Sequence, residues 1–154
     1  MIYLEAKNLT VGYNGKPLIK NIDFTLNRGE ILTMIGPNGA GKSTILKTVI
    51  GELKKIDGEI MMEGKDLFSF SRKEIAKKIA ILMTERLDPE LMTCFDMVAT
   101  GRYPYTGKLG ILSEQDRQVI GKAMEKTNVT HISSQDFMEI SDGQRQRVML
   151  ARAL

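Results

Sequence analysis

The 154-residue sequence has one cysteine, one histidine and no long apolar run, and each scarcity excludes a class of protein. Cys94 has no partner for an internal disulfide, which fits a reducing compartment. No stretch approaches the roughly 18 apolar residues that a membrane-spanning helix needs, and the N-terminus lacks the apolar core of a signal peptide. Any role at a membrane would therefore depend on a partner.

An excess of charge of one sign is also missing, because 22 basic and 19 acidic residues leave a formal net charge of +3. The lysines and arginines are scattered and form no dense block, so we expect no nucleic-acid partner. No cationic neighbour in sequence activates the Cys94 thiol, and the single histidine, His131, is expected at the surface. With 42% hydrophobic and 27% charged residues, the composition is that of one globular domain.

What the sequence does contain is a glycine-rich stretch with the pattern G-x-x-x-x-G-K-[ST]. It comprises Gly36, Pro37, Asn38, Gly39, Ala40, Gly41, Lys42, Ser43 and Thr44. Glycine permits positive φ angles and a close backbone approach, so the N–H groups of such a loop, with the following helix N-terminus, surround phosphates. The pattern predicts that Lys42 contacts the β- and γ-phosphates of a nucleotide and that Ser43 binds Mg²⁺.

Hydrophobic patterns around this loop predict strands that alternate with helices. We expect strands over 2–9, 16–26, 30–35, 58–62 and 79–83, and helices over 43–50, 71–78, 95–101, 113–127 and 142–154. Ser71 and Glu74 have the spacing of a capping box, and Ser113 is expected to cap the helix that follows it. The β-rich first part and the mostly helical last part place the chain in the α/β class.

A second motif lies near the end of the chain, at Ile140-Ser141-Asp142-Gly143-Gln144. It closely resembles the L-S-G-G-Q signature of ATP-binding-cassette (ABC) ATPases, with Ile140 in place of leucine and Asp142 in place of the first glycine. Together with the phosphate loop, it makes the sequence resemble an ABC transporter ATPase subunit over essentially its whole length. Ser141 and the backbone near Gly143 would form an anion site at a helix N-terminus, and capping by Ser141 is compatible with that role.

The resemblance implies a fold and a division of the chain. The fold is a P-loop-type α/β core with an N-terminal antiparallel part and a helical subdomain that carries the signature. The core is expected over 1–84 and the helical subdomain over about 85–150, in one partial ABC domain. The resemblance also implies that ATP binds with Mg²⁺. Tyr13 matches the aromatic residue that stacks on adenine, with ordinary packing at a strand end as the alternative.

The resemblance further implies that two subunits share each nucleotide. In a head-to-tail homodimer, Ser141, Gly143 and Gln144 would contact the γ-phosphate held by the other subunit, and with Lys42 they are the expected catalytic residues. The family's glutamine that contacts Mg²⁺ aligns with Thr84, which stands beside Glu85. Thr84 or Glu85 could reach the metal, or the contact could be lost.

The segment Gly101-Arg102-Tyr103-Pro104-Tyr105 resembles G-R-x-P-[HY] of importers for ferric siderophores, haem and vitamin B12. In those proteins this region meets the transmembrane permease, whereas a packed loop is the alternative for the two tyrosines. The importer resemblance implies a cytoplasmic subunit on the inner face of the membrane, supplied by a periplasmic or surface binding protein. A soluble ABC ATPase not tied to transport is a weaker alternative, because such proteins usually carry two cassettes or long insertions.

Several elements of the family pattern are missing from this sequence, among them the D-loop and the switch histidine, for which His131 is not a substitute. The family has an apolar strand that ends in Asp-Glu, beyond the signature, which holds Mg²⁺ and polarises the attacking water. Asp136 and Glu139 precede the signature and are poor substitutes. We therefore expect a truncated subunit with an incomplete sheet, a non-catalytic fragment that binds nucleotide weakly or not at all. The exposed sheet edge favours self-association or marginal stability.

Overall fold

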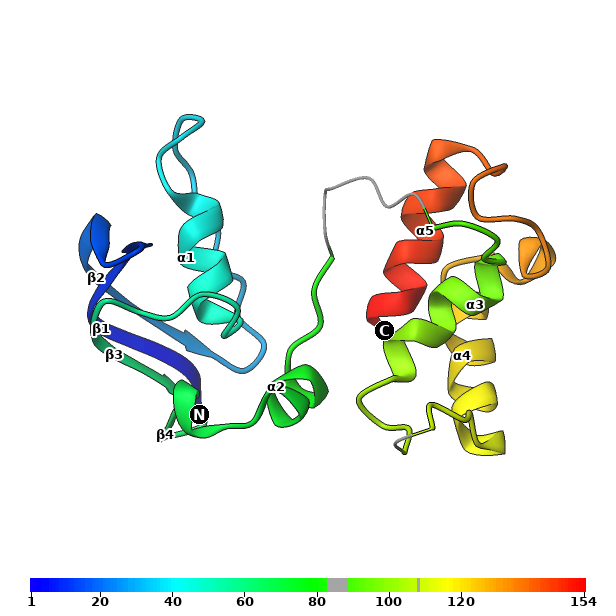
Figure 1. Ribbon diagram of the computed structural model, residues 1–154, viewed down its shortest axis with the longest axis horizontal. Coiled ribbons are helices and arrows are strands. Elements are labelled where there is room, and N and C mark those ends of the chain that lie inside the picture. The colour runs from blue at the N-terminus through cyan, green and yellow to red at the C-terminus, as the bar shows by residue number, and fades with distance from the viewer. Residues whose placement is uncertain (83–88, 108) are drawn as a thin grey trace. The chain divides into compact units, whose positions relative to one another are not determined.

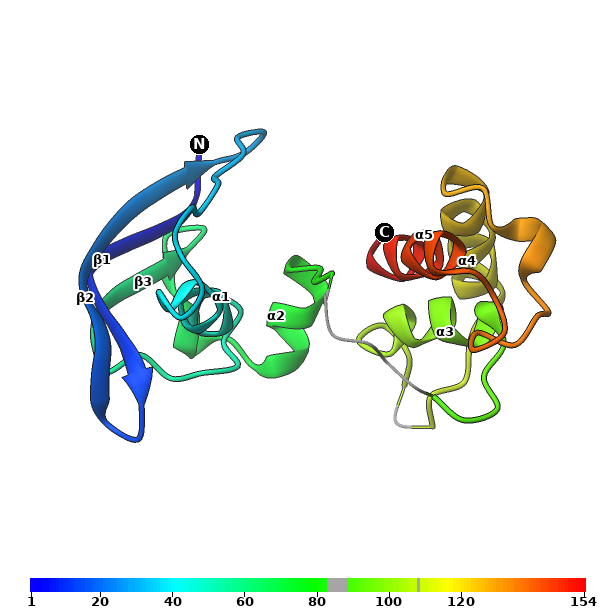
Figure 2. The ribbon, with the colours of Figure 1, turned by 90° about the horizontal axis from the view of Figure 1, so that it is seen from above.

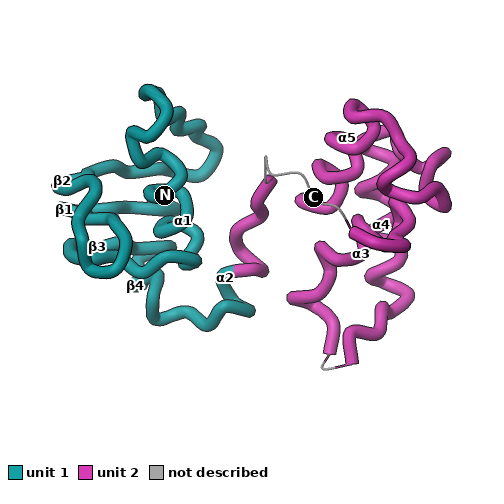
Figure 3. Tube along the Cα trace, turned by 45° about the horizontal axis from the view of Figure 1, so that its top comes forward, with its two compact units in different colours: residues 1–75 teal, residues 76–154 magenta. Residues whose placement is uncertain are grey.

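The computed structural model describes residues 1–82, 89–107 and 109–154, and the chain forms two compact units (Figure 3). The first unit is Met1–Ile75 and contains the sheet, and the second is Ala76–Leu154 and is largely helical (Figure 1). Thr84 and Glu85, the two candidates for the Mg²⁺-contacting position, lie outside the described residues.

The first unit is built on a four-stranded antiparallel sheet with the order β2-β1-β3-β4. Its strands are β1 (Ile2–Tyr13), β2 (Lys16–Asn27), β3 (Asp57–Met62) and β4 (Lys65–Asp66). The helix α1 (Lys42–Val49) packs against β1 on one face of this sheet, as Figure 2 shows. A 3₁₀ turn, η1 (Leu67–Ser69), and the helix α2 (Arg72–Lys78) follow β4. These elements confirm the strands predicted in the first half of the sequence, apart from 30–35, and both predicted helices.

A bulge keeps one face of β1 in the core along the strand. Strict alternation from the buried Ala6 would bury the polar Asn8. Instead, the pairing with β2 shifts between Ala6 and Leu9, Asn8 takes a φ of 47°, and its N–H donates to the Asp23 carboxylate at 2.8 Å. Leu9 and Val11 are then fully buried, so the extra residue preserves the apolar face of the strand.

Two predicted strands are not formed. Residues 30–35 have no regular structure, and Ile31 and Ile35 are each 93% exposed. Residues 79–82 are equally irregular, and Met83 lies outside the described residues. A strand needs hydrogen bonds to a neighbouring strand, and within the described residues none of the four strands pairs with either segment. The local apolar sequence is therefore insufficient, because the pairing that it requires is non-local.

The second unit is a helical bundle. It contains α3 (Cys94–Ala99), α4 (Glu114–Lys126) and α5 (Asp142–Ala153), with the 3₁₀ turns η2 (Thr100–Arg102) and η3 (Thr130–Ile132). Its buried core consists of side chains from the three helices and from the segment between α4 and α5: Cys94, Met97, Val98, Ala99, Ile120, Ala123, Met124, Val129, Ile132, Phe137, Ile140, Val148, Met149 and Ala151. The three helices predicted in this half of the sequence are confirmed.

Capping boxes begin all three of these helices. The Thr93, Ser113 and Ser141 hydroxyls each accept a hydrogen bond from the N–H three residues later, and the side chain at that position accepts one from the backbone N–H of the cap residue. The predicted Ser71–Glu74 pair at α2 also forms, with Ser71 N–H donating to the Glu74 carboxylate at 2.8 Å. These short-range exchanges satisfy N–H groups that have no partner inside the helix.

Asp116 extends one capping box into an ion pair. Its carboxylate accepts hydrogen bonds from the Ser113 N–H and hydroxyl at 3.0 and 2.6 Å, and from Arg102 Nε at 2.9 Å. The hydrogen bonds from Ser113, followed by the one from Arg102, hold the pKa of Asp116 below its ordinary value. Arg102 therefore fixes the segment after α3 to the first turn of α4.

Candidate functional site

The glycine-rich loop lies between β2 and α1, within the first unit. Residues 36–40 are exposed, and Gly39 and Gly41 take φ angles of 81° and 87°, in the left-handed region that favours glycine. A Cβ at Gly41 would lie 2.5 Å from Ile19 Cδ1 of β2. The backbone angle at position 41 therefore favours glycine, and any other residue there would also displace the end of the Ile19 side chain.

Lys42, the first residue of α1, folds over this loop. Its Nζ donates hydrogen bonds to the carbonyl oxygens of Gly36 at 2.6 Å and Pro37 at 2.7 Å. The side chain thus holds an ammonium group inside the loop, beside the N-terminus of α1, where an anion is favoured. Ser43 follows at the exposed start of the helix, and Thr44 is buried.

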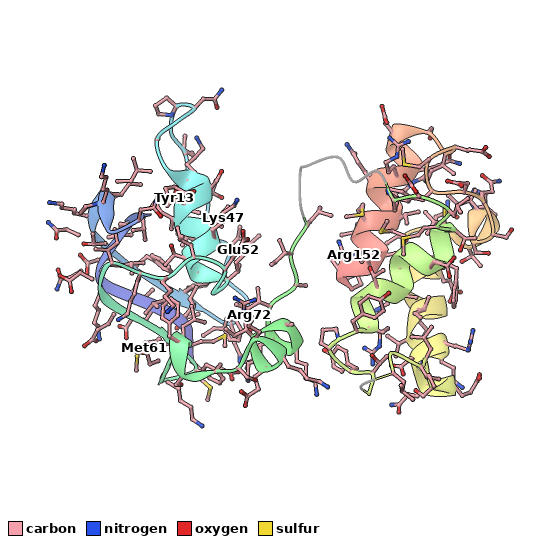
Figure 4. All side chains as sticks on the ribbon, viewed as in Figure 1. Tyr13, Lys47, Glu52, Met61, Arg72 and Arg152 are labelled. Atoms are coloured by element: carbon pink, nitrogen blue, oxygen red, sulfur yellow. The ribbon has the colours of Figure 1, made fainter. Side chains whose placement is uncertain are left out.

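Tyr13, the last residue of β1, lies beside the same helix (Figure 4). The Thr44 hydroxyl donates to Tyr13 Oη at 3.3 Å, and the tyrosine is 48% exposed. Its hydroxyl is thereby attached to α1, while part of the ring remains accessible for stacking. The sequence predicts an aromatic contact for Tyr13, but it does not predict this hydrogen bond to the phosphate-loop helix.

The signature residues gather at the N-terminus of α5, in the second unit. The Ser141 N–H and hydroxyl each donate to Gln144 Oε1 at 2.9 Å, and the Gln144 N–H donates back to Ser141 Oγ at 3.3 Å. Ser141 and Gly143 are exposed, and a Cβ at Gly143 would meet no atom within 4 Å. Ser141 therefore caps the helix in a position that is accessible from outside.

The remaining ionisable candidates lie in the second unit. The Asp136 carboxylate accepts the Met138 N–H at 2.7 Å, and Glu139 and His131 are exposed. Cys94 is buried, and burial, followed by the Asp136 charge, raises the pKa of its thiol. Across residues 1–82, 89–107 and 109–154, no group of three His, Cys, Asp or Glu side chains could hold a metal ion.

The segment after α3 is held closely against α5. A Cβ at Gly101 would lie 2.3 Å from the Arg152 carbonyl oxygen, so this close approach requires glycine. The Arg102 guanidinium lies 3.9 Å from the centre of the Tyr105 ring. Tyr103 and Tyr105 are 59% and 46% exposed, so the segment presents two aromatic side chains at the surface of the second unit.

A lysine held over a glycine-rich loop at a helix N-terminus places the first unit among the P-loop nucleotide-binding domains. The family model described as "ABC transporter" matches residues 19–154. The chain therefore belongs to the ABC transporter family. In the part of the chain that the structure describes, no helix has the length and apolar character needed to cross a membrane.

Individual proteins show the same relationship. An uncharacterised ABC transporter ATP-binding protein of Methanocaldococcus jannaschii is 45% identical over 151 residues, which are 98% of this chain and 52% of that protein. The iron(3+)-hydroxamate import ATP-binding protein FhuC of Bacillus subtilis is 36% identical over 151 residues, 98% of this chain and 56% of FhuC.

A solved ABC transporter structure gives the same fold. It is described as of the metal-chelate type in an inward-facing conformation, and it is 29% identical with a TM-score of 0.82. The match covers 99% of this chain and 55% of that one. The chain thus spans about half the length of the curated relatives that it matches.

Proposed function

We propose that this chain is the nucleotide-binding part of the ATPase subunit of an ABC importer. The observation that carries the proposal is that both the Lys42 ammonium group and the Tyr13 ring are held at α1. Lys42 Nζ is held over the loop at 2.6 and 2.7 Å from two loop carbonyls, and Tyr13 is bonded to Thr44, two residues further along the helix. A phosphate contact and an aromatic surface for a base are therefore fixed to one rigid element.

In this proposal, different residues of the chain contact the base, the phosphates and the metal ion. Tyr13 stacks on the adenine ring, and residues 36–44 surround the phosphates with backbone N–H groups. Lys42 contacts the β- and γ-phosphates, and Ser43 offers its hydroxyl to Mg²⁺, which neutralises phosphate charge when it is bound. Thr84 is the proposed second contact to the metal, with Glu85 as the alternative.

A second subunit completes the proposed site. Ser141, Gly143 and Gln144 of one subunit face the γ-phosphate held by the other, in a head-to-tail homodimer. Their accessible position at the start of α5 supports this arrangement. The exposed tyrosines of segment 101–105 support contact with a transmembrane permease, which would hold the subunit at the cytoplasmic face of the membrane.

The proposed cargo is an iron-siderophore, haem or cobalamin-like solute. The relative FhuC carries the name of an iron(3+)-hydroxamate import protein, and the segment 101–105 fits the same group of importers. The solute would reach the permease from a periplasmic or surface binding protein. ATP binding and hydrolysis in the whole subunit would drive its uptake.

Tyr13→Ala is expected to weaken ATP binding about tenfold, because base stacking on an aromatic ring contributes about 1–3 kcal/mol. Tyr13→Phe keeps the ring and should bind ATP within about threefold of the unchanged chain. Isothermal titration of ATP with Mg²⁺ measures both. Inorganic triphosphate is the matched control ligand, since it has no base to stack. Equal losses for ATP and triphosphate, or no saturable ATP binding by the unchanged chain, would contradict the proposal.

We further propose that this 154-residue chain binds ATP without hydrolysing it. In the family a carboxylate polarises the attacking water, and the Asp136 carboxylate is already engaged with the Met138 N–H at 2.7 Å. Phosphate release by the chain at millimolar ATP is therefore expected to equal that of Lys42→Ala. A turnover that disappears in Lys42→Ala would show that the chain itself is catalytic.

A further inference from the structure

Asp142 places a carboxylate in the first turn of α5, between Ser141 and Gly143. The side chain is 89% exposed. The free N–H groups of a first turn attract anions, but a fixed negative charge beside them repels a phosphate. Asp142 therefore opposes the proposed contact between the signature and a γ-phosphate unless its charge is neutralised.

Arg145 supplies the neutralising charge and also holds the preceding turn. Its Nη1 lies 3.0 Å from Asp142 Oδ1. Its Nη2 donates to the carbonyl oxygens of Met138 at 3.2 Å and Ile140 at 3.4 Å, and the guanidinium lies 5.7 Å from the centre of the Phe137 ring. One guanidinium thus joins the turn before Ser141 to the first turn of the helix.

Unequal burial shows which partner of the pair is fixed. The Arg145 side chain is 13% exposed, against 89% for Asp142. Its Nε is buried and has no hydrogen-bond partner among the described atoms, whereas Nη1 and Nη2 make the hydrogen bonds that hold the group. The arginine is therefore a fixed counter-charge, and the carboxylate is the partner that turns toward it.

We propose that Arg145 is a positioning residue for the signature site. It draws the Asp142 carboxylate to itself, and its hydrogen bonds to the carbonyls that lead into Ser141 hold the guanidinium in place. The N-terminus of α5 is thereby left able to accept the phosphate of a nucleotide held by a second copy of the chain. This inference rests on the proposed function, since it assumes that the signature contacts that phosphate.

Sedimentation velocity of the chain with and without ATP and Mg²⁺ tests the inference through nucleotide-dependent dimer formation. Arg145→Met leaves the carboxylate uncompensated and is expected to weaken the ATP-dependent dimer about fivefold, and by up to about 30-fold, which are the typical and upper effects of one charge at a helix N-terminus. Asp142→Gly should dimerise as well as the unchanged chain or better. The double variant should return to within about threefold of it, because the charge that Arg145 neutralises is gone.

Arg117→Met is the matched control, because it removes an exposed arginine from α4 in the same unit and should leave dimerisation unchanged. If Arg145 were merely structural, the double variant would remain as weak as Arg145→Met, and that result would overturn the inference. An unaffected Arg145→Met, or no ATP-dependent dimer of the unchanged chain, would overturn it too.

ATP affinity is titrated on the same samples. This measurement distinguishes a failure of the role proposed for Arg145 from a failure of the proposed function. Absence of ATP binding by the unchanged chain overturns both proposals. ATP binding that depends on Lys42, without rescue in the double variant, overturns only the role of Arg145.

Discussion

Lys42→Ala is expected to weaken ATP binding by about 100-fold, because hydrogen bonds to charged groups each contribute about 1.5–3 kcal/mol. The substitution removes the ammonium group proposed to contact the β- and γ-phosphates. It also removes the two hydrogen bonds, at 2.6 and 2.7 Å, that hold the side chain over the carbonyls of Gly36 and Pro37. Isothermal titration with ATP and Mg²⁺ measures the loss.

Lys47→Ala is the matched control, since it removes the same charge from the same helix. Lys47 Nζ lies 3.7 Å from Glu52 Oε1, and the two residues lie near each other on the first unit, away from the loop (Figure 4). An exposed ion pair of this kind contributes little, and we expect ATP affinity within about twofold of the unchanged chain. Equal losses in the two variants would mean that general charge, rather than the loop geometry, attracts the nucleotide.

Gly58→Ala is expected to destabilise the first unit by about 3 to 5 kcal/mol, through backbone strain and overpacking together. Gly58 in β3 has a φ of 83°, and a Cβ there would lie 2.2 Å from the Asn8 carbonyl oxygen and 2.7 Å from Leu9 Cα. Both obstacles are backbone atoms of β1 at its bulge, so they cannot move without disturbing the strand pairing. Hydrogen exchange should show loss of protection in β1 and β3.

Gly64→Ala separates the cost of backbone strain from the cost of overpacking. Gly64 follows β3 in the same sheet with a φ of 77°, but a Cβ there would meet no atom within 4 Å. We expect a cost of about 1 to 2 kcal/mol from the left-handed backbone alone. Protection in α4 of the second unit serves as an internal reference in both variants. If the two substitutions cost the same, the close approach of β3 to β1 is not the constraint described above.

The sequence predicts the helices well because their signals are local. Ser71, Ser113 and Ser141 each begin a helix by exchanging hydrogen bonds with a residue three positions later, and that spacing is visible in the sequence. The strands predicted over 30–35 and 79–83 do not form over the described residues 30–35 and 79–82, for the opposite reason. Their apolar residues favour a strand, but a strand forms only with a partner strand, and that partner can be far away in the sequence.

The sequence predicts the motifs that make up the candidate site, but it does not predict the hydrogen bonds between residues that are far apart in the sequence. The phosphate loop and the signature are contiguous patterns, each with its own chemistry. The Thr44–Tyr13 hydrogen bond joins residues far apart in sequence, and it follows only from the packing of α1 on β1. For Arg145, the spacing to Asp142 is a local signal that was available, but the contacts with the carbonyls of Met138 and Ile140 depend on an irregular turn.

The central claim is that residues 36–44 bind the triphosphate of ATP while Tyr13 contacts the base. Titration of ATP and Mg²⁺ into the ¹⁵N-labelled chain, followed through its backbone amide signals, tests it most directly. We predict that the largest saturable shifts occur at residues 36–44 and at Tyr13, and that Lys42→Ala removes them at the same ATP concentration. Unchanged amide signals over 36–44, or shifts confined to the second unit, would contradict the account.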